Sequence, residues 1–174
     1  MRLHTHRGTN SVRYSSTTGT TQSISGTVST VRRQNELIDR YGWAVTVVFP
    51  TEDRPGAPFA YTIGLTAYHH PELIIAGLDA RLSQQLLNDL ATRFFQQAQR
   101  FTAGQRISDL LAGYDAIIVE GPPTDDLYPG HAIARYGKDR VRLQQVVWPD
   151  QHGRFPWEPG YAINRQAQPV LNRP

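Results

Sequence analysis

The sequence of 174 residues contains no cysteine. Disulfide scaffolds, zinc–thiolate sites, iron–sulfur clusters and cysteine nucleophiles are therefore all excluded. Long apolar runs are absent as well, because the best one, Trp43 to Phe49, is far shorter than the ~20 residues of a membrane-spanning helix. The N-terminus is polar and shows no apolar signal segment, so the sequence favours a cytoplasmic protein that is not bound to a membrane.

Charge is unevenly distributed along the chain. Residues 1–35 contain five of the 18 basic residues and no acidic one, whereas the remainder is slightly acidic. The high proportion of Ser and Thr in this first segment predicts a flexible, basic leader over 1–35, with an edge strand at 24–31 or a basic arm as alternatives. Residues 36–174 are expected to form a single globular domain, for which no nucleic-acid partner is expected.

The pattern from residue 35 onward predicts strands and helices in a defined order. Asn35 to Gly42 resembles a short helix with an N-cap and a terminal glycine. Residues 43–49 and 58–65 alternate between polar and apolar side chains, which predicts a hairpin, and 72–78 form an apolar third strand. Further strands are expected at 115–120 and 141–148, a helix between 124 and 137, and surface coil after 148, whereas 105–111 fit no single element.

Asp79 is placed to cap a long helix over about residues 80–103. Apolar side chains recur at helical spacing there and are expected to be buried, among them Leu82, Leu86, Leu90 and Phe94. The predicted fold class is α+β, with a largely antiparallel sheet, one long amphipathic helix and short flanking helices.

Motifs of known catalytic sites are missing from the sequence. GxGxxG, P-loop, GxSxG and HExxH patterns do not occur. His70-Pro71-Glu72 matches the first half of a zinc deaminase signature, but the second half requires cysteines. No cofactor, metal site or catalytic residue is therefore assigned.

Two mixed-polarity strands contain polar side chains in mid-strand positions, at Thr62 and Gln144. A purely structural strand favours apolar or β-branched residues there. A glycine such as Gly64 permits the close approach of a ligand or of another backbone segment, and it is equally typical of a bulge or of tight helix packing. We therefore expect a cleft between the 58–65 strand and the Trp-Pro-Asp turn. The candidate residues are Tyr61, Thr62, Gly64, Glu72, Gln144, Trp148 and Asp150, with His70, Tyr128 and His131 as secondary candidates.

Two simpler interpretations stay open. Asp150 precedes a glycine-containing turn and is typical of a turn former. The whole cluster could also serve only to connect the strands of the sheet. In the predicted cleft, Thr62 and Gln144 are expected to satisfy each other's hydrogen bonds beside Gly64.

Several strings in a fixed order resemble one known family. They are PFAYTIGL (58–65), PEL (71–73), LQQVVWPD (143–150), FPW (155–157) and QPVL (168–171). Together they resemble the bacterial Domain of Unknown Function family 4262 over about residues 36–171. The resemblance implies a compact domain and marks a set of signature residues, but it carries no activity. This set comprises Tyr61, Thr62, Gly64, Leu65, Glu72, Gln144, Trp148, Asp150 and Trp157.

The sequence therefore leaves three classes of function open. The first is a small-ligand-binding domain that could also be an enzyme. The second is a non-catalytic protein-interaction module that uses aromatic side chains of the C-terminal coil. A third rests on analogy in the order of elements with split-barrel flavin-binding proteins, which dimerise around their cofactor. A homodimer is an open alternative to a monomer.

Overall fold

The computed structural model describes residues 19–172 and divides the chain into two compact units, 1–33 and 34–174. The first 18 residues of the predicted leader lie outside the described part. Helix α1 (Gly19–Tyr41) crosses the boundary between the units.

The second unit is built around one six-stranded sheet with the strand order β1-β2-β3-β6-β5-β4. All neighbouring strands are antiparallel except the central pair, β3 and β6. The expected α+β class with a mostly antiparallel sheet is therefore confirmed, and the parallel pair makes the sheet mixed. The elements are β1 (Ala44–Val48), β2 (Phe59–Ile63), β3 (Glu72–Ala76), α2 (Ala80–Gln97), β4 (Arg106–Leu111), β5 (Tyr114–Gly121), α3 (Gly130–Tyr136) and β6 (Leu143–Val147), with short 3-10 turns at Leu65–Tyr68 and Arg165–Ala167.

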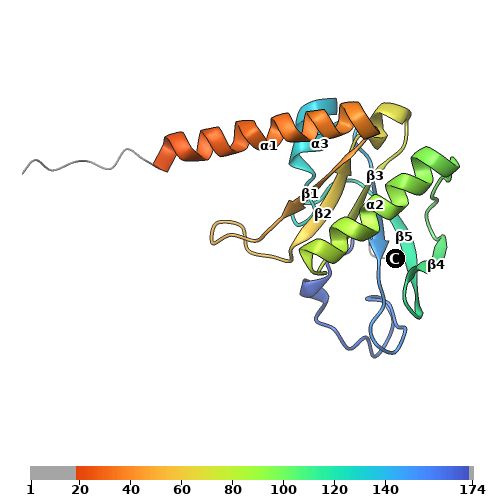
Figure 1. Ribbon diagram of the computed structural model, residues 1–174. Helices are drawn as coiled ribbons and strands as arrows, with labels where there is room; N and C mark the ends of the chain where they lie inside the picture. Colours follow the sequence, from red (N-terminus) through yellow and green to blue (C-terminus); the bar gives the residue numbers. More distant parts are fainter. Residues whose placement is uncertain (1–18, 173–174) are drawn as a thin grey trace, which may run out of the picture. The chain divides into compact units, whose positions relative to one another are not determined.

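Both faces of the sheet are covered by apolar side chains. Helix α2 packs on one face, where its Leu87 and Leu90 meet Leu73, Ile75 and other strand residues (Figure 1). On the opposite face Tyr61, Ile74 and Leu143 pack with Ala132 of α3 and with Ile38. Because both faces of the sheet are covered, β2, β3 and β6 have no exposed residue.

The helices differ from their predicted bounds. Helix α1 is already helical from Gly19, so Asn35 lies inside it and its side-chain oxygen accepts a hydrogen bond from Arg135 instead of capping. No proline interrupts residues 19–41, which permits this length. The structure therefore has helix, and neither coil nor an edge strand, over 19–35, and α1 is longer than α2.

Helix α2 begins where the sequence predicts. The Asp79 side chain accepts hydrogen bonds from the N–H groups of Arg81 and Leu82, as expected of an N-cap. The helix ends at Ala98, which has a left-handed φ of 52°, well before the expected Gly104. Of the four positions expected in the core, Leu86, Leu90 and Phe94 are buried. Leu82 is 38% exposed because it belongs to the first turn, and its place in the core is taken by Leu87.

Candidate functional site

The candidate residues fall into separate hydrogen-bonded groups. Glu72 is the first residue of β3 and is bonded to Thr62 near the end of β2, whereas the Trp148 indole donates to the carbonyl of Ala76 at the other end of β3, at 2.8 Å. Four residue steps of about 3.3 Å separate Glu72 from Ala76, so the two ends are about 13 Å apart.

Glu72 is the centre of the first group and is completely buried. Its Oε1 accepts hydrogen bonds from Gly64 N (3.0 Å), Thr66 N (3.0 Å) and Thr66 Oγ1 (2.8 Å). Its Oε2 accepts from Thr62 Oγ1 (2.7 Å) and Leu65 N (3.3 Å). Burial raises the pKa of the Glu72 carboxyl above its usual value, and the hydrogen bonds from Thr66, Thr62 and Gly64 act against that rise. This group holds the turn after β2 against β3.

Gly64 makes that turn possible. Its φ is 140°, and a Cβ atom at this position would lie 2.1 Å from the carbonyl oxygen of Gly42 and 2.8 Å from the Cα of Trp43. Only glycine fits, because both neighbouring atoms belong to backbone. The close approach expected at Gly64 is thus made by another part of this chain.

Tyr61 belongs to a second group, in the core that includes Ala132 of α3. Its hydroxyl accepts a hydrogen bond from the N–H of His131 at 3.0 Å, and burial raises the pKa of Tyr61. The amide nitrogen of Gln34 lies 3.1 Å from Nδ1 of His131 and donates to Thr46 Oγ1 at 2.7 Å. Tyr61 and His131, two sequence candidates, are therefore brought together, whereas Tyr128 lies apart and has Arg54 over its ring at 5.9 Å.

Trp148 and Asp150 form a third group that anchors the C-terminal coil. Gln168 is fully buried, and its side chain forms two hydrogen bonds with the backbone of Trp148. The Asp150 carboxylate accepts from the N–H groups of His152 (2.8 Å), Arg154 (2.9 Å) and Ala162 (2.9 Å). Burial raises the pKa of Asp150, but these three bonds outweigh burial and leave the pKa below its usual value. The turn-forming interpretation of Asp150 therefore accounts for its contacts.

Gln144, near the beginning of β6, and His70 both contact Phe101 and make up the fourth group. The Gln144 amide nitrogen donates to the carbonyl of Phe101 (2.9 Å) and to the carboxylate of Glu120 (3.2 Å). His70 packs on the ring of Phe101, with 6.1 Å between ring centroids. Gln144 thus bonds to partners other than Thr62, whose hydroxyl instead accepts from the N–H of Leu73. The expected bond between Thr62 and Gln144 does not form.

Two polar atoms of this fourth group have no hydrogen-bond partner among the described residues, Nε2 of His70 and Oε1 of Gln144. His70 is 5% exposed and Gln144 2% exposed, so neither atom faces bulk water. His70 Nδ1 lies 2.7 Å from the carbonyl oxygen of Pro71, which can only accept, so Nδ1 carries the proton. Burial lowers the pKa of His70, and the neutral ring therefore presents Nε2 as an acceptor.

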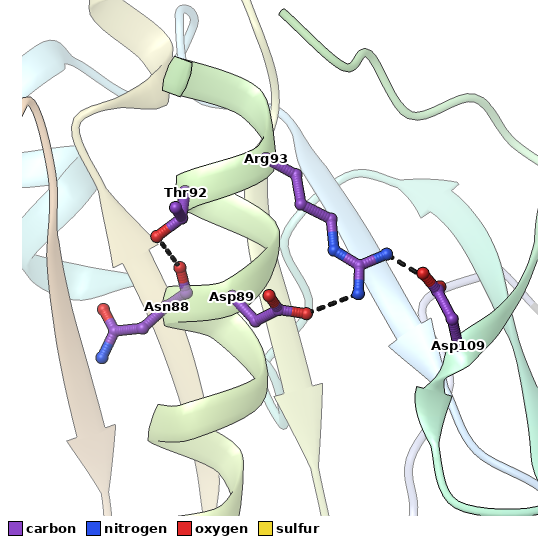
Figure 2. Close-up of polar contacts among 5 residues, drawn as sticks. All are labelled: Asn88, Asp89, Thr92, Arg93 and Asp109. Atoms are coloured by element: carbon purple, nitrogen blue, oxygen red, sulfur yellow. Dashed lines mark hydrogen bonds and ion pairs between the residues drawn. The ribbon is translucent and has the colours of Figure 1, made fainter. Parts of the chain in front are cut away.

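A polar groove of about 430 Å³ lies between α2 and β4. Arg93, only 13% exposed, projects from α2 and forms ion pairs with Asp89 (2.6 Å) and with Asp109 of β4 (2.8 Å), as Figure 2 shows. The hydrogen bond to Asp109 contributes most to raising the pKa of Arg93. Other polar lining residues are Gln97, Gln99, Gln105 and Ser108. This volume is within the range of small-molecule sites.

Sequence reasoning missed Glu120, Phe101, Gln145 and Gln168. Gln145 binds the last segment of the chain, because its amide donates to the Pro169 carbonyl and accepts from the N–H of Leu171. A second glutamine in an apolar strand was a usable signal for Gln145. Phe101 and Glu120 gave none, because their roles depend on contacts between distant segments.

Within residues 19–172, no group of three or more His, Asp or Glu is arranged to hold a metal ion. In the same part of the chain no helix is both long and apolar enough to cross a membrane.

A search of curated proteins finds no match to the sequence. A family model described as "Domain of unknown function (DUF4262)" matches residues 37–162, which is most of the chain. The chain therefore belongs to the DUF4262 family, as the ordered strings of its sequence indicate.

Proposed function

We propose that the domain binds a small molecule at the beginning of β3 and β6, beside His70 and Gln144. The observation that carries the proposal is the pair of buried acceptors, His70 Nε2 and Gln144 Oε1, which have no partner among the described residues. A buried polar atom without a hydrogen bond costs about 1–3 kcal/mol, so native proteins rarely retain two in one place.

The two acceptors restrict the chemistry of the ligand. Both atoms accept and neither donates, because Gln144 Nε2 is directed to Phe101 and Glu120 and the His70 proton lies on Nδ1. The ligand must therefore supply the hydrogens, as an amine, an amide or a hydroxyl compound does. Glu120 is half-buried, so the group reaches the surface on that side.

The proposal is limited to binding. A neutral histidine within the electrostatic influence of Glu120 is compatible with general-base chemistry, but among the described residues no hydroxyl group is hydrogen-bonded to His70 Nε2. The interaction-module alternative has less support, since Trp157 and Tyr161 are half-buried and fasten the coil through stacking on Phe155 and a bond to Gln168. The open sheet, with β1 and β4 as its edges, gives no support to the split-barrel analogy.

The test uses the ¹⁵N-labelled full chain and follows the chemical shift of His70 Nε2. Methylammonium, acetamide and ethylene glycol serve as probes of the three donor classes. We expect a saturable shift with at least one probe, and at least tenfold weaker binding in Gln144→Leu. The exposed Gln84→Leu is the matched control and should bind normally.

His70→Asn provides a second variant in case Gln144→Leu fails to fold. Asparagine can retain the bond to the Pro71 carbonyl but lacks an atom equivalent to Nε2. It should lose the thermal stabilisation that the effective probe gives, whereas His69→Asn should keep it, because asparagine tolerates the left-handed φ of 58° at that position. The absence of any saturable shift, or equal binding by Gln144→Leu and the wild type, would overturn the proposal.

A further inference from the structure

The two edges of the sheet are built differently. Strand β4 is one edge, and it carries exposed Arg106, Ser108 and Asp109 and a register shift between Ile107 and Leu111. Charged side chains and irregular register are the usual means of preventing a strand from pairing with another chain. Strand β1 forms the other edge and contains neither, because residues 44–48 read Ala-Val-Thr-Val-Val.

The outer side of β1 is regular and unpaired. Its register with β2 runs without a shift from Ala44 opposite Ile63 to Val48 opposite Phe59. Among the backbone–backbone hydrogen bonds given for the described residues, none joins the outward-facing groups of β1 to another segment. Strand β1 therefore presents a row of backbone N–H and C=O groups at the edge of the sheet, where a further strand can pair.

We propose that β1 pairs antiparallel with β1 of a second copy of this chain, around a twofold axis at Thr46. This pairing places Val45 opposite Val47 of the partner subunit and Ala44 opposite Val48 of the partner subunit. Pairs of β-branched residues stabilise neighbouring strands, and no like charges are brought together. The sheet then continues from one copy into the other.

In this pairing, each face of the sheet continues into the corresponding face of the second copy's sheet. Val45 and Val47 both pack against the core under α2, so their pairing extends the same apolar layer into the second copy. The same register places Phe49 opposite Trp43 of the partner subunit. Phe49 is 62% exposed, and this contact covers it. A strand that is self-complementary on both faces favours a second copy over an unrelated peptide, and the inference does not depend on the ligand site.

The absence of native cysteine permits a direct distance test with single spin labels on the full chain. In the proposed register the two copies of Phe49 are six residues apart along the paired strands, about 20 Å. Labels at Phe49→Cys should therefore give a short distance near that value. Labels at the control position Tyr114→Cys, on β5, should be much farther apart, on the order of 40 Å.

Light scattering on the unlabelled wild-type chain and on both variants accompanies the distances. The proposal expects a dimer in all three, and a Phe49→Cys variant that is weaker but still dimeric at high concentration. A monomeric wild-type chain would overturn it. A dimer with the short distance at Tyr114→Cys, or with a long distance at Phe49→Cys, would also overturn it, because the chains would then pair through another surface.

Discussion

Thr62 Oγ1 donates a hydrogen bond to Glu72 Oε2 at 2.7 Å and accepts one from the N–H of Leu73 at 2.9 Å. The backbone pairing of β2 with β3 ends at Tyr61 and Ile74. Beyond that point, the Thr62 hydroxyl takes the place of a backbone hydrogen bond between the two strands. A threonine and a glutamate, both fully buried, thereby set the direction of the turn that follows β2.

Replacing Glu72 by glutamine should destabilise the domain by at least about 2 kcal/mol. The new amide NH₂ group would face donors, because three of the five groups around Glu72 are backbone N–H groups that can only donate. Urea unfolding measures the loss, and Glu52→Gln, at an exposed position, serves as the control. Equal midpoints for the two variants would contradict the role assigned to Glu72.

Gly64→Ala should prevent folding or cost several times more than Gly56→Ala. Both glycines have a φ near 140–148°, so both alanine variants carry similar backbone strain. Only at Gly64 does the added Cβ meet backbone, at 2.1 Å, whereas nothing lies within 4 Å at Gly56. Thermal unfolding of the two alanine variants distinguishes a steric collision from backbone strain. Similar falls in melting temperature for Gly64→Ala and Gly56→Ala would contradict the close contact between Gly64 and the backbone of Gly42.

Acid should weaken the attachment of the C-terminal coil through Asp150. Its pKa is lower in the folded state than in the unfolded chain, so its contribution is complete above the usual carboxyl pKa and is lost as the pH falls toward the folded value. Asp150→Asn should therefore be less stable than the wild type at neutral pH, and the difference should shrink on acidification. Urea midpoints between neutral and acidic pH test this, with Asp53→Asn as an exposed control; a constant difference would refute it.

Deleting residues 1–33 should leave the second unit folded. The chain divides at that point into separate compact units, and Gln34, which contacts Thr46 and His131, is retained. We expect the melting temperature to change by less than about 5 °C. A larger fall would mean that the first segment contributes to the packing of the domain.

The sequence predicted the local features well. Alternation located β1 and β2, and the Asp79 cap located the start of α2, because these signals lie within a few neighbouring residues. The end of α2 was misplaced because Ala98 adopts a left-handed conformation that its residue type does not indicate. The parallel pairing of β3 with β6 joins distant segments and had no local signal.

The sequence indicated polar positions within the sheet but not how their side chains are arranged. Mid-strand polarity drew attention to Thr62 and Gln144, yet it could not show that Thr62 bonds to Glu72 and Gln144 to Phe101. Alternation along a strand specifies a face and not a position along the sheet. Trp148 was therefore grouped with Glu72, although the two lie at opposite ends of β3.

The most direct measurement of the central claim is a high-resolution crystal structure of the full chain as purified, with attention to His70 Nε2 and Gln144 Oε1. We predict density for a molecule larger than water that donates to both atoms, and we predict that this density is absent from His70→Asn crystals. One ordered water bonded to both acceptors, or a direct bond between the two side chains, would contradict the claim, because the polar group would then be satisfied without a ligand.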